Sequence, residues 1–569
     1  MAALYILPQD TASEASHSWV TAQLQQCLAD HEECIVGHEV IPPLPTRVLD
    51  LGLLPAAADP IHVLETHGSR GQYIALSHCW GDPKLMPTKL TAHTLNKYQQ
   101  GIPYNSLPRT FQDAVTFTRK MGIRYLWIDS LCIIQRDHDR DSEQDKELSD
   151  RDWASESGQM CNVYRNSHLT LAAASSTDCT GGLFFRLKVV ELNGTTDDGP
   201  YQLFCREGPR HQSIDFPLMK RGWVAQEQLL SPRTLFFGEK ELLWQCLKRK
   251  GCQCGHSWAE FPGHSKLPKT DHWSEERFRE QTGLDIIRHF NFKQLALIKK
   301  WHETIASYSA TSLSYPTDKL AAIDGIAQYM HPMRNCDYLA GLWSDSLPFD
   351  LLWSIVGAGS TRVVESSTNQ RKLLWSSDQD LFPTWSWASV DCEVTWELAG
   401  NLECPEGGIM VTRVEDQVIP KAYELRLRGV LVPCWLGVVR ATNQPLAEFP
   451  DIEPMLFRPD CIVVEELDDR TEVYCLRVLR YKGSTGFESE NFCSLVLQIK
   501  DGERNAYERL GIVAFESGRR DGLETFHDID DDQDSVVELG TYQNGAELFP
   551  PWWEPYEGWK VEEVILTLV

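Results

Sequence analysis

Histidine, cysteine, serine and carboxylate residues follow two short apolar segments, and such residues could support ligand binding or acid–base chemistry. The segment 73–76 leads into Ser77-His78-Cys79, and the segment 125–128 leads into Asp129. Polar groups beyond the carboxyl ends of parallel strands commonly face a ligand. Asp129 therefore has two interpretations: a structural salt bridge or turn cap, or a carboxylate that orients a ligand hydroxyl or His78.

Two cysteines near these strand ends, Cys79 and Cys132, are candidate nucleophiles with His78 as the base. The thiolate is the reactive form of cysteine, and a base within hydrogen-bond reach lowers the thiol pKa. The alternative is that both thiols are buried and pack as small apolar side chains, which is the commoner role of cysteine.

Two glutamates lie in apolar surroundings: Glu156 beside a helical apolar stripe and Glu227 in the segment Trp223-x-x-Gln226-Glu227. A carboxyl group in an apolar cleft has a raised pKa and can act as a general acid or base, or can stabilise an oxocarbenium-like centre. Structural pairing of Glu227 with Arg221 or Arg233 is the alternative. The candidates for contacts with a ligand or cofactor are Ser77, Cys79 and Arg221.

Two groups of residues contain the atom types that zinc prefers. They are Cys27-x3-His31-x2-Cys34 and the set Cys246, Cys252, Cys254 and His256. The first group has three ligands where tetrahedral zinc needs four, and the second lacks paired Cys-x-x-Cys knuckles. We therefore predict no metal site from the sequence, and zinc binding by the second set remains open.

Standard nucleotide and hydrolase signatures are missing from the sequence. It contains no Gly-x-x-x-x-Gly-Lys-Ser/Thr loop, no Gly-x-Gly-x-x-Gly and no Gly-x-Ser-x-Gly. Walker-type ATP hydrolysis, a standard dinucleotide fingerprint and an α/β-hydrolase serine therefore lose support, and no cofactor is predicted.

The elements that must position these residues follow from hydrophobic periodicity and turn signals. A helix is expected over 12–31, strands over 48–54 and 61–64, and a helix between Ser106-Leu107-Pro108 and Gly122. The strand 125–128 follows, so the order strand, helix, strand predicts a parallel βαβ unit. The charged segment 136–152 is expected to be a solvated loop, with a helix from Trp153 through Tyr164 and a strand over 169–174.

The remaining sequence predicts further helices and a hairpin, followed by a region of strands. A short helix is expected over 221–228, a hairpin over 233–238 and 241–246, and helices within 285–330. From about residue 383 apolar and polar residues alternate, which indicates a mostly antiparallel β module.

Length and charge limit the function classes. The 569 residues fit two to four domains, and the net charge of −27 disfavours nucleic acid and anionic membranes as partners. No apolar run is long enough to span a membrane, and the start of the chain does not resemble a signal peptide. We therefore expect a cytoplasmic protein whose 17 cysteines are reduced.

Five ordered blocks of the sequence resemble the fungal heterokaryon incompatibility (HET) domain. They are Tyr73-Ile74-Ala75-Leu76-Ser77-His78-Cys79-Trp80-Gly81, Leu107-Pro108-Arg109-Thr110-Phe111-Gln112-Asp113-Ala114, Tyr125 to Gln135, Trp153-x-x-Glu156-x-x-x-Met160-x-x-x-Tyr164, and Arg221-Gly222-Trp223-x-x-Gln226-Glu227-x-x-Leu230-x-x-Arg233. Similar blocks occur outside them: Cys27-x3-His31 with Pro45-Thr46-Arg47, Tyr338 to Trp343, and Pro383 to Ser389. Several of the 19 tryptophans fall inside these blocks.

The resemblance implies an α/β fold. Together with the residue patterns above, it predicts a lead-in over 1–70 and a parallel-sheet-containing HET domain, similar in outline to TIR domains, over 71–250. The residue patterns alone predict a helical segment over 251–382 and a β-rich module over 383–569. The family implies a cytoplasmic fungal protein that acts in self/non-self recognition and programmed cell death, with protein partners or self-association. Some TIR domains cleave NAD with a catalytic glutamate, but a shared fold does not establish a shared function.

Three functions follow as hypotheses. The first is an effector or regulator of incompatibility and cell death that acts through protein contacts. The second is an enzyme that cleaves a nucleotide such as NAD, with Glu156 or Glu227 at the reacting ribose carbon and Asp129 on the ribose hydroxyls. The third is a small-molecule enzyme of fungal secondary metabolism.

Overall fold

The computed structural model describes residues 10–34, 41–52, 60–82, 88–137, 139–186, 189–196, 199–206, 216–255, 266, 292–356, 382–396, 401–403, 410–412, 425–439, 444–449, 452–459, 471–482, 490–501, 506–516 and 562–568. The chain forms two compact units. The first comprises residues 1–272 and 311–330, and the second comprises residues 273–310 and 331–569. No helix among the described residues has the length and apolar character needed to cross a bilayer.

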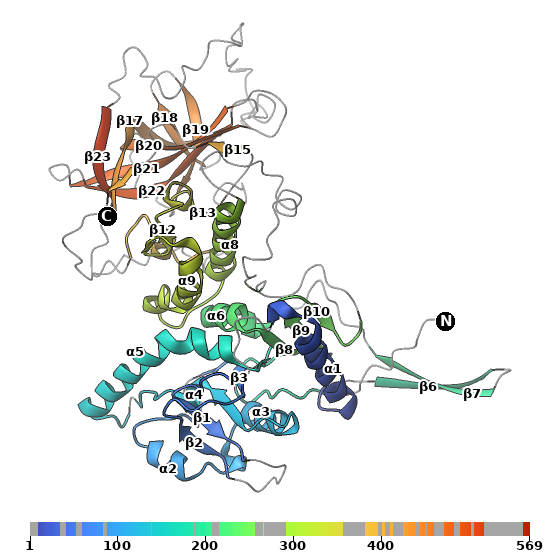
Figure 1. The fold of residues 1–569 in the computed structure, drawn as a ribbon. Coiled ribbons are helices and arrows are strands. Elements are labelled where there is room, and N and C mark those ends of the chain that lie inside the picture. Colours follow the sequence, from blue (N-terminus) through green and yellow to red (C-terminus); the bar gives the residue numbers. More distant parts are fainter. Residues whose placement is uncertain are drawn as a thin grey trace, which may run out of the picture. The chain divides into compact units, whose positions relative to one another are not determined.

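An eight-stranded mixed sheet forms the centre of the first unit (Figure 1). Its strands, in spatial order, are β10 Lys250–Cys252, β9 Leu242–Cys246, β8 Arg233–Phe237, β5 Leu169–Ala172, β3 Tyr73–Ser77, β4 Tyr125–Ile128, β1 Arg47–Asp50 and β2 His62–Glu65. The four central strands β8, β5, β3 and β4 are parallel, whereas both edges are antiparallel. The predicted α/β class is therefore confirmed. A separate hairpin pairs β6 Val189–Thr196 with β7 Gly199–Arg206.

Helices supply the outer layers of this unit. They are α1 Glu14–Asp30, α2 Leu95–Gln100, α3 Arg109–Lys120, α4 Asp129–Cys132, α5 Glu143–Asn166 and α6 Gly222–Leu230. The N-cap residue of α3 is Pro108, which forms no side-chain cap, and the hydroxyl of Ser106 donates to the carbonyl of Pro103 instead of capping the helix. Gly122 follows the end of α3 with a left-handed φ of 73°, as expected.

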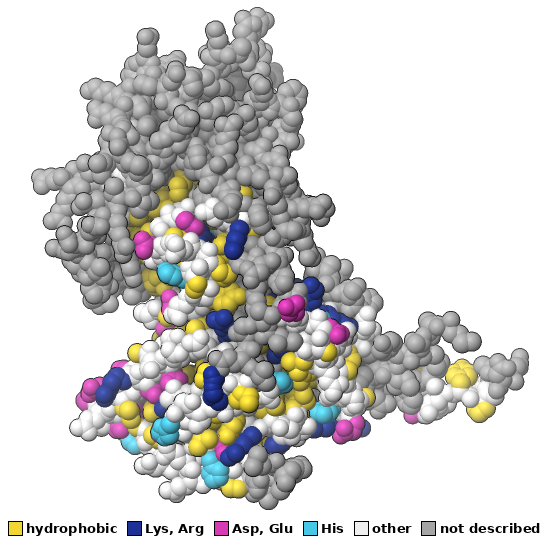
Figure 2. All heavy atoms as spheres, in the orientation of Figure 1, with side chains coloured by type: hydrophobic (Ala, Val, Ile, Leu, Met, Phe, Trp, Pro, Cys, Tyr) yellow, Lys and Arg dark blue, Asp and Glu magenta, His cyan; other side chains and the backbone are white. Residues whose placement is uncertain are grey.

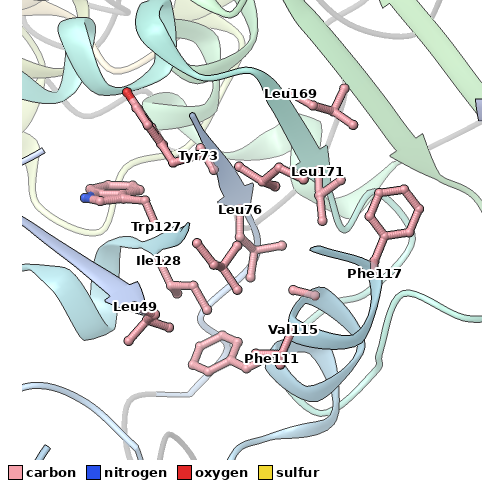
Figure 3. Packing of buried hydrophobic residues seen from close by; sticks show 14 of the residues in the cluster. Leu49, Tyr73, Leu76, Phe111, Val115, Phe117, Trp127, Ile128, Leu169 and Leu171 are labelled. Carbon is pink, nitrogen blue, oxygen red and sulfur yellow. The ribbon is translucent and has the colours of Figure 1, made fainter. Parts of the chain in front are cut away.

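The two faces of the sheet pack against different helices because side chains alternate along each strand. Ile128 of β4 lies with Phe111 and Val115 of α3 in the core shown in Figure 3. Trp127, its neighbour, meets the ring of Tyr164 of α5 edge to face, with ring centroids 5.6 Å apart. The α3 and α5 layers are therefore separated by the sheet.

The helix α5 begins ten residues before the expected start at Trp153, so the prediction of a loop over the whole of 136–152 is wrong. Ser142 and Asp145 form a capping box, and exposed ion pairs such as Lys146–Glu143 support the first turns. Charged side chains of both signs gather over this end of α5 in Figure 2. The charge density that suggested a loop instead forms the solvated surface of a helix.

Residues 273–310 belong to the second unit, and the following segment 311–330 belongs to the first unit again. Gly222 donates its amide to Ser312 at 2.9 Å, and the Ser312 amide donates to Lys220 at 2.7 Å. The helix α9 Ala321–Arg334 starts in this segment, and its Gly325 amide donates to the side chain of Gln226 at 3.1 Å. These hydrogen bonds connect the segment 311–330 to α6 and to the residues just before it.

The second unit contains helices α8 Phe292–Ser309 and α10 Leu347–Asp350, the end of α9, two small sheets and a larger β-sheet. The small sheets pair β11 Tyr338–Leu339 with β12 Leu342–Trp343, and β13 Ser354–Ile355 with β14 Val394–Thr395. The larger sheet contains β15 Asn401–Glu403, β16 Met410–Thr412, β17 Leu425–Val439, β18 Gln444–Phe449, β19 Ile452–Pro459, β20 Thr471–Lys482, β21 Glu490–Asp501, β22 Ala506–Glu516 and β23 Glu562–Leu568. Its pairings are antiparallel except for β22 with β23.

Tryptophan side chains form the core between the helices of this second unit. Trp301 and Trp387 both donate their indole N–H to the carbonyl of Gly341 at 3.0 Å. A Cβ at Gly341 would lie 2.6 Å from the indole nitrogen of Trp387, and the backbone there has a φ of 97°. Glycine is required at this position, so the Tyr338 to Trp343 block is a packing motif.

Candidate functional site

The strands β3 and β4 bring the polar residues that follow them to one edge of the sheet. Their parallel register aligns Leu76 with Ile128, which places Ser77 level with Asp129. Both strands then stop, β3 running into His78 and β4 into the short helix α4. This register confirms the parallel pairing of the predicted βαβ unit and brings the two strand ends to one edge of the sheet.

Alternation sends neighbouring residues of β3 to opposite faces. Ser77 points to the same face as Tyr73, whose hydroxyl donates to the Val163 carbonyl of α5 at 2.5 Å. His78 points to the opposite face and meets the ring of Phe111 of α3 edge to face, with centroids 5.0 Å apart. The polar groups therefore surround the end of β3 on both sides.

The carboxylate of Asp129 is held by two hydrogen bonds. The indole N–H of Trp80 donates to Oδ2 at 2.7 Å, and the Ser130 amide donates to Oδ1 at 2.7 Å. His78 Nδ1 lies 3.7 Å from Oδ1, and the Asp129 side chain is 14% exposed. Asp129 is thus both a turn cap, as its structural interpretation expected, and a neighbour of His78, as its functional interpretation expected.

Glu227 of α6 is buried at the same strand ends. Burial raises its pKa to about 7, while the charge of Arg221 and the hydroxyls of Ser77 and Tyr164 act in the opposite direction. The charge of Asp129 adds to the upward shift. A carboxyl group with this pKa can donate or accept a proton near neutral pH, which Asp or Glu on a surface cannot do efficiently.

His78 is neutral near pH 7 because burial, assisted by the charge of Arg221, lowers its pKa to about 4. Asp129 opposes this shift but does not overcome it. Arg221 also donates a guanidinium hydrogen bond to the carbonyl of His78. The site thus combines the titratable carboxyl of Glu227, the hydrogen-bonded side chain of Asp129 and a neutral imidazole.

Several buried polar atoms in this region find no hydrogen-bond partner among the described residues. They are both ring nitrogens of His78 and Ser130 Oγ. Buried polar groups are nearly always satisfied by protein, ordered water or a ligand. Their concentration at one strand edge indicates a place for water or a polar ligand. We call Ser77, His78, Asp129, Ser130, Tyr164, Arg221 and Glu227 the strand-end cluster.

The two candidate nucleophiles receive no activation from this arrangement. Burial raises the pKa of the Cys132 thiol to about 12, and burial also raises the pKa of Cys79. Both side chains are buried. A thiol in this state remains protonated at neutral pH, so the geometry favours their packing role.

The contacts of Glu156 differ from those of Glu227. Burial raises its pKa, and a hydrogen bond to Thr46 and the charge of Arg47 oppose the shift. The Nη2 atom of Arg47 in turn donates to both carboxylate oxygens of Asp152, at 2.6 and 2.5 Å. The surroundings of Glu156 are those of a structural ion-pair network, which sets the two candidate glutamates apart.

Sequence reasoning missed three members of the site. The sequence places Tyr164 in the apolar stripe of its helix and Trp80 in a family-like block, and it places Ser130 at a strand end without a specific role. The polar tip of a buried tyrosine needs a partner, and that requirement is the signal that could have identified Tyr164.

The proposed zinc ligands near residue 250 separate in the structure. Cys246 lies with Cys27, His31 and Cys34, whereas Cys252 and Cys254 lie with Glu241. His256 lies outside the described residues. The sequence grouping of Cys246 with the residues that follow it is therefore wrong, because the β9–β10 turn directs their side chains apart.

Comparison with protein families identifies the region that contains the strand-end cluster. Residues 73–227 match the model for the family described as heterokaryon incompatibility protein (HET). No curated protein and no solved structure matches the chain. The matched stretch begins at the first residue of β3 and ends at Glu227. The chain therefore contains a HET domain over residues 73–227.

Proposed function

We propose that this protein is an effector or regulator of programmed cell death in fungal heterokaryon incompatibility. The observation that carries the proposal is the HET match, whose limits enclose the strand-end cluster from Ser77 to Glu227. Partner proteins in incompatibility signalling, or further copies of the chain, would bind this domain. A cytoplasmic location fits this role.

Inducible expression in a filamentous fungus tests this proposal. We expect the full chain to reduce colony growth and admit a membrane-impermeant dye, and Glu227→Gln to weaken both effects. Glu156→Gln is the matched control because its carboxyl belongs to the Arg47 network. Unimpaired growth with the full chain, at expression confirmed by immunoblot, would contradict the proposal.

A second candidate activity is cleavage of the N-glycosidic bond of a nucleotide such as NAD. The observation in its favour is Glu227, a buried carboxyl with a pKa of about 7 at the ends of β3 and β4. In this reaction the bond between ribose C1′ and the nicotinamide nitrogen breaks. Water then adds its hydroxyl to C1′ and releases a proton, so the products are nicotinamide and ADP-ribose.

The site residues have defined roles in that second candidate. Ionised Glu227 would stabilise the positive charge that develops at C1′, and Asp129 would accept hydrogen bonds from ribose hydroxyls. The neutral His78 ring, whose two nitrogens have no hydrogen-bond partner among the described residues, would hydrogen-bond the ligand. Access would run past Asp129, Trp80 and Arg221, whose side chains are not fully buried.

Nicotinamide release from NAD by the purified full chain measures this activity. We expect Glu227→Gln to lower the rate by two orders of magnitude or more, and Glu156→Gln to retain most of it, at roughly the scale for a lost charge-stabilising group. The rate with wild-type protein should rise as pH increases through about 7, where Glu227 ionises. No release, or equal release by the two variants, would exclude Glu227 as the catalytic carboxylate.

A further inference from the structure

Four potential metal ligands from two distant parts of the chain meet beside the edge of the first unit's sheet. Cys27 belongs to the end of α1, His31 and Cys34 follow it, and Cys246 ends β9. Their ligand atoms all lie within 4.8 Å of one another. The exposed fractions are 0% for Cys27 and Cys34, 2% for Cys246 and 8% for His31. We call these four residues the Cys3His cluster.

We propose that the Cys3His cluster binds one structural zinc ion that fastens α1 to β9. Three thiolates and one imidazole are a ligand set typical of closed, tetrahedral zinc sites. The cluster supplies the fourth ligand that the Cys27-x3-His31-x2-Cys34 segment lacks. It lies outside residues 73–227, which the HET family model matches.

The spacing of the ligand atoms fits a single metal ion. With Zn–S bonds of about 2.3 Å and Zn–N bonds of about 2.0–2.1 Å, a tetrahedron places two sulfurs about 3.8 Å apart and sulfur and nitrogen about 3.5 Å apart. Cys246 Sγ lies 3.4 Å from Nδ1 of His31. A two-iron cluster distributes its ligands over two metal ions and would need wider separations than this compact set provides.

The surroundings of the cluster favour thiolates. The Nε atom of Arg233, a residue that is 5% exposed, donates to Cys27 Sγ at 3.3 Å. Its other described hydrogen bonds go to the carbonyls of Cys34 and His168, so in the described part of the chain it has no carboxylate partner. Zinc with three thiolates carries a net charge of −1, which would neutralise the buried guanidinium.

A backbone amide also points at the cluster. The N–H of Arg249 donates to Cys246 Sγ at 3.3 Å from the turn after β9. Hydrogen bonds to ligating atoms fix the orientation of metal ligands and are a regular part of metal sites. Apolar packing of three thiols would require neither this amide nor the imidazole of His31.

The other cysteine group near the sheet edge does not have this geometry. Cys252 Sγ and Cys254 Sγ lie 2.7 Å apart, which is closer than two thiolates on one zinc ion would lie. Glu241, the third residue of that group, accepts the backbone amide of Cys254 at 3.0 Å. The group therefore offers only two sulfurs and a carboxylate that already has a partner.

Metal analysis of the purified full chain tests the proposal. We expect about one zinc ion per chain by mass spectrometry of the metal content, lost in Cys246→Ser and retained in Cys161→Ser, a buried cysteine of α5 outside the cluster. Stoichiometric iron in place of zinc, zinc absent after growth in zinc-supplemented medium, or zinc retained in Cys246→Ser would overturn it.

A ligand exchange keeps the test informative if Cys246→Ser fails to fold. His31→Cys preserves four ligands and should retain zinc, whereas His31→Ala should lose it. After replacement of zinc by cobalt, the wild-type protein should show the intense visible bands of tetrahedral cobalt, and His31→Cys should add thiolate charge-transfer absorption. Octahedral cobalt spectra, or identical spectra for wild type and His31→Cys, would contradict ligation by His31.

Discussion

Glu227 links the chemistry of the strand-end cluster to the stability of the fold. Its carboxyl is fully buried beside Ser77, Tyr164 and the guanidinium of Arg221, and burial is the largest cause of its raised pKa. A carboxyl whose pKa is higher in the folded than in the unfolded state binds an extra proton when folded. The free energy of unfolding therefore falls as pH rises from about 4.5 to about 7.

Replacement of Glu227 by glutamine should remove this pH dependence. Relative to the wild type, the Glu227→Gln protein should gain stability as pH rises from 5 to 8, by an amount on the order of 3 kcal/mol. Urea denaturation at both pH values measures this difference. Glu143→Gln, on the exposed first turn of α5, should give the same offset at both pH values. A pH-independent offset for Glu227→Gln would show that the carboxyl titrates normally.

The ion pair of Arg47 and Asp152 offers a second test at the residue scale. Arg47 donates to both oxygens of Asp152 and to the Cys132 carbonyl, and its side chain is 6% exposed. Asp152→Ala should lower the free energy of unfolding by about 3–5 kcal/mol, because a buried guanidinium loses its counter-charge. Chemical denaturation measures the loss.

A neighbouring exposed pair provides the control for Asp152. Arg136 pairs with Asp150 on the surface of the same helix, so Asp150→Ala should cost about 1 kcal/mol or less. The double variant Arg47→Met with Asp152→Leu should cost less than Asp152→Ala, because it leaves no unpaired charge. Equal losses for Asp152→Ala and Asp150→Ala would show that burial does not strengthen the pair.

The sequence identified most members of the strand-end cluster but not their grouping. Polar residues after buried strands marked Ser77, His78 and Asp129, because such positions need a partner or a function. The choice between Glu156 and Glu227 depends on which layer each helix enters, and sequence spacing does not encode that. The sequence marks Cys27, His31, Cys34 and Cys246 as potential zinc ligands but divides them between two groups for the same reason, since Cys246 lies far along the chain from Cys27.

At the scale of elements, hydrophobic periodicity located the core helices and strands of the first unit. The strand prediction 125–128 coincides with β4, and the helix prediction 12–31 agrees with α1 to within two residues at its start. The prediction failed at the start of α5, where polar residues carry no periodic apolar signal. There the Ser142 capping box and charge pairs maintain the helix without burial.

Two glycines in helices of the first unit should respond oppositely to alanine. A Cβ on Gly325 of α9 would lie 2.5 Å from Cys161 Cβ and 2.6 Å from Gln226 Oε1, whereas a Cβ on Gly158 of α5 would meet no atom within 4 Å. Gly325→Ala should therefore destabilise the fold by about 1–3 kcal/mol, and Gly158→Ala should stabilise it by about 0.5–1 kcal/mol.

Thermal and urea denaturation of both alanine variants measure these changes. Their substitutions are identical, so helix propensity favours alanine equally in each and the difference isolates the packing of α9 against α5 and α6. Similar stabilisation by both would mean that the α9 segment does not pack at the distances seen here.

At the scale of the whole molecule, each of the two compact units is built from segments that are separate in the sequence. The predicted HET boundary of 71–250 excludes α1, β1 and β2, yet β1 pairs with β4 and α1 packs beside β9. The first unit also includes 311–330, which contacts α6 through Ser312 and Gly325. Long-range contacts of this kind leave no local signal in the sequence, whereas the change to alternating strands near residue 383 does.

The returning segment 311–330 should be required for a stable first unit. We consider a fragment of residues 1–330 in which 273–310 is replaced by a Gly/Ser linker of equal length, because those residues belong to the second unit. This fragment should unfold cooperatively, since it retains every segment of the first unit. A fragment that ends at residue 272 should have a lower thermal midpoint, because the Gly222 and Lys220 backbone groups lose Ser312 and the Gln226 side chain loses Gly325.

The same comparison connects the segment to the site. The helix α6 contributes Glu227, so loosening α6 should admit water and return the pKa of Glu227 toward its ordinary value. The stability of the shorter fragment should then depend less on pH between 5 and 8 than that of the longer one. Equal thermal midpoints and equal pH dependence in the two fragments would show that 311–330 neither stabilises α6 nor maintains the surroundings of Glu227.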